Sequence, residues 1–296
     1  MEQLKKCPLC SGERISHHLT IPDYFLSKEN FSVSKCLDCG FIFTNPRPTK
    51  NDISFYYKSD DYISHSNKNT GLISFFYKIV RNYSLRQKFN LISKFKSPGH
   101  LLDIGCGTGE FLHFMHLHNW HTTGIEPAQE PRYFAVNNYL LDVFDEEILS
   151  SLAPESFDLI TLWHVLEHVE DLNLRIQQIK KLLKKDGLLI IALPNCLSWD
   201  AKHYKNFWAA WDLPRHRYHF TPSTIHLLLR KYQFNIFYVH PLKFDSYYIS
   251  LLSEKYKHGK PNFMRAFLNG FRSNFSAKRN GNNYSSLVYF IKNENS

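Results

Sequence analysis

The glycine-rich segment from Leu101 to Phe111, LLDIGCGTGEF, constrains the fold more than any other part of the sequence. An apolar, strand-forming stretch leads into glycines at alternate positions, Gly105, Gly107 and Gly109, and helix-forming residues follow. Glycine lets the backbone turn sharply and approach a ligand closely, and the N-terminus of the next helix lies beside such a turn. The segment therefore predicts a strand, a ligand-binding turn and a helix within an α/β sheet.

Strand and helix patterns alternate after this segment, which indicates a parallel sheet covered by helices on both faces. The predicted strands are Leu101–Gly105, His121–Glu126, Leu141–Phe144, Phe157–Trp163, Gly187–Leu193, Asn235–His240 and Ser285–Lys292. The predicted helices are Glu110–His118, Gln129–Asn138, Asp171–Lys185 and Pro222–Tyr232, the last with Thr221 as its N-cap and Pro222 at its first position.

The glycine spacing also selects between cofactors. A nicotinamide-binding loop requires G-x-G-x-x-G, which would place a third glycine where Glu110 stands. The G-x-G-x-G spacing favours S-adenosylmethionine instead. The predicted cofactor-binding residues are Asp103, Gly105, Cys106, Gly107 and Gly109 in the loop, and Glu126, Pro127, Asp145, Trp163 and His164 at later strand ends.

Two of these residues have specific predicted contacts. Glu126, at the end of the second strand, is expected to accept hydrogen bonds from both ribose hydroxyls. Asp145 is expected near the adenine amino group, with Glu146 and Glu147 as competing candidates. Trp163 either contacts the cofactor or substrate or packs in the core.

Four cysteines in the first forty residues form two C-x2-C pairs, Cys7 with Cys10 and Cys36 with Cys39. Each pair is followed closely by a glycine, and four thiolates in this pattern favour one tetrahedral structural zinc. The gap between the pairs exceeds the usual ~15–20 residues, so a short hairpin or helix is expected to fill it. The alternative, a redox dithiol, is disfavoured because such motifs rarely come in pairs and cytoplasmic disulfides are rare.

Segments spread over nearly the whole chain resemble one family. They are the CPLC…CLDCG cysteine module, FTNPRP, LLDIGCGTGEF, WHVLEHVED, LIIALPN and WDLPRHRYHFTPSTI (Trp211 to Ile225). Together they resemble the zinc-ribbon-bearing class I methyltransferases of polysaccharide and sugar modification. The resemblance implies a Rossmann-like seven-stranded sheet whose last strand inserts antiparallel, and methyl transfer to a substrate over the C-terminal strand ends. Similar sugar C-methyltransferases carry a large further C-terminal domain absent from this sequence, so their substrate and catalytic pair are not carried over.

This reading divides the chain into three parts. Residues 1–46 form a zinc-ribbon module, residues 47–96 a helical linker or lid, and residues 97–296 the methyltransferase domain with an insertion at 244–280. The segment PRHRYHF supplies the leading catalytic candidates, His216 as a base or substrate anchor and Arg215 as a partner for a substrate phosphate or carboxylate. His164 is a further catalytic candidate. Cys196 is interpreted as a small buried side chain rather than a nucleophile.

The net charge of +9 is concentrated near the C-terminus. Residues 241–296 contain nine Lys or Arg and three Asp or Glu, which gives +6. This excess indicates either a solvated basic face or an anionic partner, namely a phosphate-bearing small molecule, a membrane surface or a nucleic acid. The leading hypothesis for the substrate is a small anionic carbohydrate, linked to a nucleotide or a lipid. An RNA methyltransferase and a zinc-dependent binding scaffold without catalysis are the alternatives.

The insertion is expected to contain two amphipathic helices, Ser246 to Lys257 and Asn262 to Phe275. In the second, phenylalanines recur every fourth residue and so share one face. Either these rings pack onto the sheet or a dimer partner, or the helix is a lid that touches an anionic membrane. The absence of a secretion signal and of an apolar run of ~20 residues favours a cytoplasmic protein, peripheral to the inner membrane face in the second case.

Overall fold

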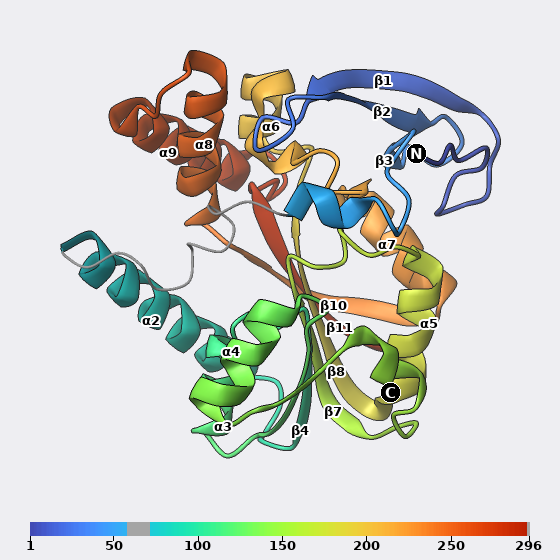
Figure 1. Ribbon diagram of the computed structural model, residues 1–296, viewed down its shortest axis with the longest axis vertical. Helices are drawn as coiled ribbons and strands as arrows, with labels where there is room; N and C mark the ends of the chain where they lie inside the picture. The colour runs from blue at the N-terminus through green and yellow to red at the C-terminus, as the bar shows by residue number, and fades with distance from the viewer. Residues whose placement is uncertain (58–71, 295–296) are drawn as a thin grey trace. The chain divides into compact units, whose positions relative to one another are not determined.

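The computed structural model describes residues 1–57 and 72–294, with the backbone alone for residues 72–80. A seven-stranded sheet has the order β10-β11-β8-β7-β4-β5-β6 (Figure 1). Its strands are β4 (His100–Ile104), β5 (His121–Ile125), β6 (Asp142–Phe144), β7 (Phe157–Trp163), β8 (Leu183–Pro194), β10 (Phe234–Pro241) and β11 (Ser286–Asn293). β4 pairs in parallel with β5 and β7, and β5 with β6. The predicted α/β fold is confirmed, and the last strand, β11, lies between β10 and β8. Its antiparallel orientation stays a prediction.

Helices α2 (Leu72–Ile92), α3 (Glu110–His116) and α4 (Gln129–Tyr139) belong with the β4–β6 half of this sheet. α3 packs on β5, and α4 packs on β6. Gly109 precedes α3 with φ +81°, and a Cβ built there would lie 2.8 Å from the Cβ of Ala135 on α4. Glycine at this position therefore allows both the turn and the close packing of the loop on α4.

A second, four-stranded sheet contains β1 (Ile15–Pro22), β2 (Asn30–Cys36), β3 (Ile42–Thr44) and β9 (Tyr218–His219), in that order. All its pairings are antiparallel. The β1–β2 hairpin fills the gap between the two cysteine pairs, as predicted. β9 comes from the PRHRYHF segment and pairs with β3, so residues 175 positions apart in sequence share one small sheet.

The chain divides into two compact units. One comprises Met1–Lys58, His164–Ile176 and Ile191–Phe290, and the other Ser59–Trp163, Gln177–Ile190 and Ile291–Ser296. The three-part division predicted from the sequence remains a prediction. The portion of the predicted linker between residues 58 and 71 lies outside the described residues.

One boundary predicted from periodicity is wrong. The helix expected at Asp171–Lys185 is α5 (Leu172–Leu182), and β8 begins at Leu183 rather than Gly187. The Asn293 side chain donates hydrogen bonds to the carbonyls of Lys184 and Lys185, which holds this backbone extended. In the sequence, Lys184 and Lys185 continue the helical pattern. In the structure, the hydrogen bonds from Asn293, 108 residues after Lys185, hold them in a strand.

The first unit also contains several helices between β8 and β11. They are α6 (Trp199–Tyr204), η3 (Lys205–Phe207), η4 (Ala209–Trp211), α7 (Pro222–Lys231), α8 (Asp245–His258) and α9 (Phe263–Arg279), and the short η1 (Ile53–Tyr57) precedes them in sequence. Thr221 caps α7 through a reciprocal bond pair with Thr224, as expected for the N-cap. No helix in the described part of the chain is long and apolar enough to cross a membrane.

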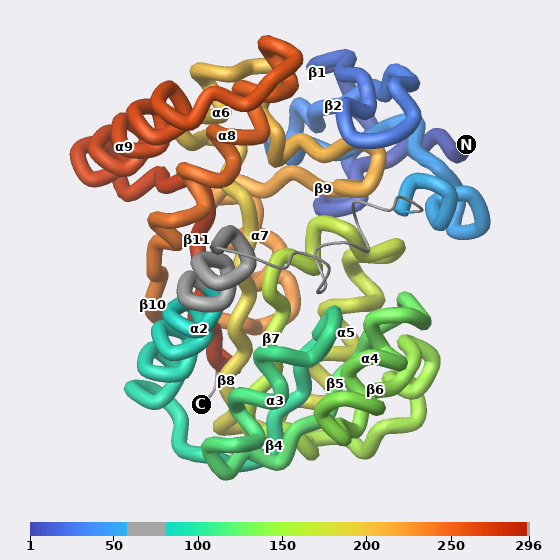
Figure 2. The backbone as a smooth tube through the Cα atoms, turned by 60° about the vertical axis from the view of Figure 1, so that its left-hand side comes forward, coloured from blue at the N-terminus to red at the C-terminus, as the bar shows by residue number. Residues whose placement is uncertain are grey.

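The two helices expected in the insertion are confirmed as α8 and α9, which run side by side (Figure 2). The expectation that the phenylalanines of α9 pack onto the sheet is wrong, because those rings are 47–73% exposed. α9 instead buries its small and polar residues, and a Cβ built at Gly270 would lie 2.6 Å from the Tyr247 ring on α8. Close approach of the two helices requires small residues at the contact, which leaves the rings facing outward.

Candidate functional site

The loop after β4 has the backbone that its glycines predict. Gly105, Gly107 and Gly109 have φ values of +74°, +55° and +81°, which side chains other than glycine rarely adopt. A Cβ built at Gly107 would meet no heavy atom within 4 Å, so this residue faces open space. The turn therefore presents bare backbone to a ligand at the end of β4.

Glu126, directly after β5, holds this turn in place. Its Oε2 accepts a hydrogen bond from the Gly107 amide at 2.8 Å, and its Oε1 accepts one from the Ala128 amide at 2.9 Å. Burial raises the pKa of this carboxyl, and the two amide bonds oppose the effect. The geometry thus gives Glu126 a role in shaping the loop, and its contact with a ribose remains a prediction.

Asp103 lies at the buried end of β4, with 2% of its surface exposed. Its Oδ1 accepts a 2.5 Å hydrogen bond from the Thr161 hydroxyl on β7. Burial raises the pKa of the Asp103 carboxyl to about 7, partly opposed by that bond and by the charge of Lys88.

The raised pKa of Asp103 predicts how stability depends on pH. Its ordinary value is 3.8, so between about pH 4 and pH 7 the folded state retains a proton that the unfolded chain has lost. The stabilising effect of that proton is complete at low pH and disappears as pH rises through 7. We expect urea unfolding to show this fall for the wild type and a smaller one for Asp103→Asn, which keeps an acceptor for Thr161. Equal pH slopes for the two proteins would contradict the prediction.

A cavity of about 350 Å³ lies beside the glycine loop, within the size range of small-molecule sites. Its lining residues are Arg81, Ser84, Leu85, Lys88, Asp103, Gly105, Cys106, Glu110, Phe111 and Trp163. The structure thus brings together four residues predicted from sequence, namely Asp103, Gly105, Cys106 and Trp163. Arg81 and Lys88 of α2 were missed, although their seven-residue spacing places them on one helix face.

Trp163, the last residue of β7, forms one wall of this cavity. The Lys88 Nζ lies 3.9 Å from the centroid of its ring, and Phe111 meets the ring edge to face. Its indole Nε1 is buried and has no hydrogen-bond partner among the described residues. A buried donor without a partner is costly, and this one indicates a site for an acceptor atom.

The remaining predicted cofactor residues do not line this cavity. Asp145 is half-exposed and forms an ion pair with Arg132 at 2.8 Å, so its carboxylate already has a protein partner. Pro127 is exposed at the end of the turn that follows Glu126. His164 belongs to the other compact unit.

His164 lies between two carboxylates. Its Nε2 is 3.1 Å from Asp245 Oδ2, and its Nδ1 is 3.5 Å from Glu167 Oε1. Burial lowers the pKa of the imidazole, but the two carboxylates outweigh this effect and raise it to about 10. His164 is therefore charged at neutral pH, and both of its nitrogens face carboxylates, so this geometry favours an ion-pair role over that of a general base.

Arg215 and His216 are both buried. The guanidinium of Arg215 pairs with Asp23 at 2.9 Å and with Asp212 at 2.7 Å, and it also donates to the Tyr56 carbonyl. This geometry favours a structural role for Arg215, joining the N-terminal module to η4, over the predicted contact with a substrate anion. His216 Nδ1 donates to the Ala210 carbonyl at 2.8 Å, and its Nε2 lies 3.9 Å from Asp212 Oδ2.

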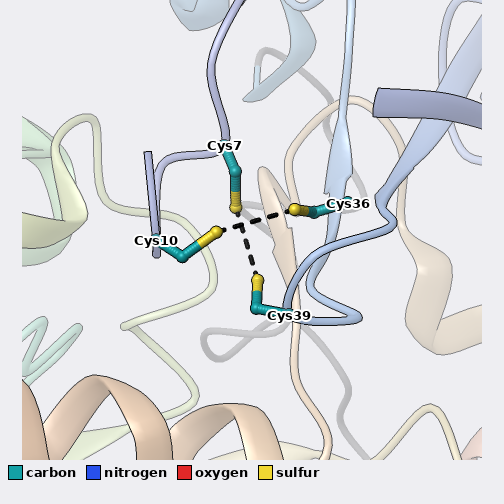
Figure 3. A group of neighbouring side chains, drawn as sticks. All are labelled: Cys7, Cys10, Cys36 and Cys39. Atoms are coloured by element: carbon teal, nitrogen blue, oxygen red, sulfur yellow. Dashed lines mark hydrogen bonds between the residues drawn. The ribbon is translucent and has the colours of Figure 1, made fainter. Parts of the chain in front are cut away.

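The four cysteines of the N-terminal module converge on one point (Figure 3). The Sγ atoms of Cys7 and Cys39 are 3.6 Å apart, as are those of Cys10 and Cys36. All four are free thiols, and their Sγ atoms lie within 4.8 Å of one another. Tetrahedral Zn–S bonds of ~2.3 Å place sulfurs ~3.8 Å apart, so the cluster fits a zinc ion coordinated by four thiolates.

Comparison with known proteins identifies relatives of this chain. Two curated relatives are named Ubiquinone biosynthesis O-methyltransferase. That of Glaesserella parasuis is 36% identical over 106 residues, covering 32% of this chain and 45% of the relative. That of Bartonella tribocorum is 35% identical over 107 residues, covering 34% and 43%. The chain therefore spans less than half the length of these relatives.

A solved structure resembles the fold more broadly. Magnesium protoporphyrin IX methyltransferase from Synechocystis PCC 6803 with bound SAH has a TM-score of 0.52 and 12% identity, covering 81% of this chain and 97% of its own. At this identity the likeness concerns the fold alone. The family model described as "Methyltransferase domain" matches residues 77–239, more than half of the chain, and so this chain belongs to that family of methyltransferase domains.

Proposed function

We propose that the protein transfers a methyl group from S-adenosylmethionine to a small anionic carbohydrate linked to a nucleotide or a lipid. The observation that supports the cofactor best is the carboxylate of Glu126 bonded to the Gly107 amide, beside the cavity at the end of β4. Membership of the methyltransferase-domain family supports the reaction class. The carbohydrate acceptor rests on the sequence resemblance and on the basic charge of the chain.

The residues present fit this cofactor. When bound, S-adenosylmethionine supplies an electrophilic methyl group on a sulfonium. Glu126 would accept bonds from the ribose, as dinucleotide folds do at this position, and the open space at Gly107 leaves room for the ligand. Arg81 and Lys88 supply positive charge for the methionine carboxylate, while Trp163 offers its unpartnered N–H.

The acceptor requires positioning more than chemical activation, because orienting two reactants contributes much of the rate. His216 Nδ1 is bonded to the Ala210 carbonyl, so Nε2 is the nitrogen that would serve as base or anchor for an acceptor hydroxyl, the role predicted from the sequence. The catalytic role predicted for His164 has no comparable free nitrogen, because both of its ring nitrogens face carboxylates.

A panel of acceptors with methyl-labelled S-adenosylmethionine tests the function. We expect label on nucleotide-linked or polyprenyl-linked sugars. Label on a precursor of ubiquinone instead would favour a substrate from the process that the relatives' name gives. RNA binding that weakens steeply with salt, together with labelled RNA, would favour the RNA alternative, and binding of the cofactor with no turnover on any acceptor would favour the scaffold.

The outward face of α9 supports a peripheral contact with an anionic membrane, which we propose as the route to a lipid-linked acceptor. This face consists of Phe263, Met264, Phe267, Leu268, Phe271 and Phe275, each at least 47% exposed. Exposed Arg265, Arg272, Lys278 and Arg279 flank it, and α9 contains no acidic residue. Apolar rings bordered by positive charge complement an anionic lipid surface.

Vesicle co-sedimentation checks this contact. We expect binding to anionic but not neutral vesicles, weakened by salt, because each basic residue near such a surface contributes roughly 1 kcal/mol. Arg272→Glu with Arg279→Glu should abolish binding. The control variant, Lys94→Glu with Lys181→Glu, makes the same charge change at exposed positions outside α9 and should retain most of the vesicle binding. A wild type that ignores anionic vesicles at low salt would rule the contact out.

A further inference from the structure

A second group of metal-ligating side chains lies in the same compact unit as the cysteines: Glu167, His168 and His216. Glu167 and His168 belong to the WHVLEHVED segment that follows β7, and His216 lies just before β9. One ligand atom from each lies within 4.8 Å of the others. The two imidazole rings meet edge to face with centroids 4.5 Å apart.

Backbone carbonyls fix the tautomers of both histidines. His168 Nδ1 lies 3.1 Å from the Arg215 carbonyl and 3.0 Å from the Tyr57 hydroxyl, and His216 Nδ1 lies 2.8 Å from the Ala210 carbonyl. A carbonyl oxygen only accepts hydrogen bonds, so each Nδ1 donates, and Nε2 is the nitrogen that each ring would offer to a metal ion. An imidazole oriented in this way by a carbonyl is the usual second-shell arrangement of a metal ligand.

The carboxylate of Glu167 completes the group. It is 1% exposed, and neither of its oxygens has a hydrogen-bond partner among the described residues. Its nearest cationic neighbour, His164 Nδ1, is 3.5 Å from Oε1 and is also held by Asp245 through its other nitrogen. A buried carboxylate without donors is strongly unfavourable, and a metal ion coordinated by Glu167 would relieve this cost.

We infer that Glu167, His168 and His216 bind a divalent transition-metal ion through two imidazoles and one carboxylate. Tetrahedral metal–ligand bonds of ~2.0–2.2 Å place two ligand atoms ~3.3–3.6 Å apart, so ligand atoms up to 4.8 Å apart need to approach by roughly 1 Å on binding. Three protein ligands leave a coordination position open, as in catalytic rather than structural sites. This donor set suits Zn²⁺, Fe²⁺ and Mn²⁺.

The open position would hold an oxygen of the acceptor, a hydroxyl or a phosphate, and this role rests on the proposed function. His216 would then be a ligand rather than a base, and the bound ion would lower the pKa of the acceptor hydroxyl. The metal site itself depends only on the geometry of the three residues.

Titration of the zinc-loaded protein with Mn²⁺, followed by electron paramagnetic resonance, tests the site. Thiolates select zinc while imidazole and carboxylate accept manganese, so the cysteines do not interfere. We expect one Mn²⁺ per chain, with nitrogen couplings from two imidazoles. Glu167→Gln should weaken binding by about 10-fold or more. Glu170→Gln removes a half-exposed carboxylate three residues away and should leave the affinity unchanged.

Circular dichroism and cofactor binding check that each variant is folded, and His216→Gln serves as a second variant if Glu167→Gln is not. Wild-type protein that takes up neither Mn²⁺ nor Zn²⁺ beyond the cysteine zinc would overturn the inference, as would equal affinity of wild type and both variants. Stoichiometric Mn²⁺ without methyl transfer to any acceptor would leave the metal site standing and sink the proposed function instead.

Discussion

Replacing Cys36 by serine is expected to abolish zinc binding and to unfold the four-stranded sheet of the N-terminal module. Cys36 is fully buried at the end of β2, with its Sγ 3.6 Å from that of Cys10. Structural zinc contributes an apparent ~10–16 kcal/mol in zinc-finger peptides, which rivals the ~5–15 kcal/mol that stabilises a whole domain. The free energy lost with the ion is therefore larger than the stability that the small module can supply without it.

The effect should extend beyond the module, because β3 pairs with β9 and the Thr44 amide bonds to the Arg217 carbonyl. We expect a new low-temperature unfolding transition by circular dichroism and loss of one zinc by elemental analysis. Cys196→Ser is the matched control, since its thiol bonds only backbone carbonyls, at 3.1 and 3.8 Å, and takes no part in the cluster. Wild-type protein with far less than one zinc per chain and four titratable thiols would refute the assignment.

The parts of the structure that the sequence predicted well are those decided by neighbouring residues. The turn at Gly105 and Gly107 needs positive φ values that glycine supplies, and the N-cap at Thr221 forms within four residues. The two-residue spacing within each cysteine pair is likewise visible in the sequence itself. Each of these features is local, so its pattern is complete within a short window.

The parts that were missed depend on residues far apart in sequence. No pattern in Tyr218 or His219 shows that they pair with β3, and Arg215 looks like an anion-binding side chain until Asp23 is placed beside it. The group formed by Glu167, His168 and His216 is likewise invisible without the fold, although each histidine was within a segment already noted. Spatial proximity over such separations is a property of topology.

The orientation of α9 shows a second kind of limit. Phenylalanines recurring every fourth residue normally indicate the buried face of a helix. In α9 the competing pattern of small residues, Ala266, Gly270, Ser273 and Ala277, marks the packed face, because the Tyr247 ring of α8 lies against Gly270 and leaves no room for a side chain there. Periodicity identifies two faces here, and only packing decides which one is buried.

Substitution of Glu126 by alanine is expected to weaken S-adenosylmethionine binding by about 100-fold or more, since hydrogen bonds to a charged group contribute ~1.5–3 kcal/mol each. Two losses combine. The ribose loses its acceptor, and the amides of Gly107 and Ala128 lose the carboxylate that holds the turn. Glu126→Gln should fall between wild type and alanine, because one of its two backbone bonds becomes a contact between two donors.

Calorimetric titration with S-adenosylmethionine measures the effect, and thermal unfolding of each variant separates lost affinity from lost structure. Glu130→Ala provides the control. It removes the same kind of side chain four residues away, from an exposed position in the first turn of α4. A Glu126→Ala protein that is folded and binds the cofactor as tightly as the wild type would remove Glu126 from the site. That result would also contradict the proposed position of the cofactor, which depends on the hydrogen bond from the Gly107 amide to Glu126.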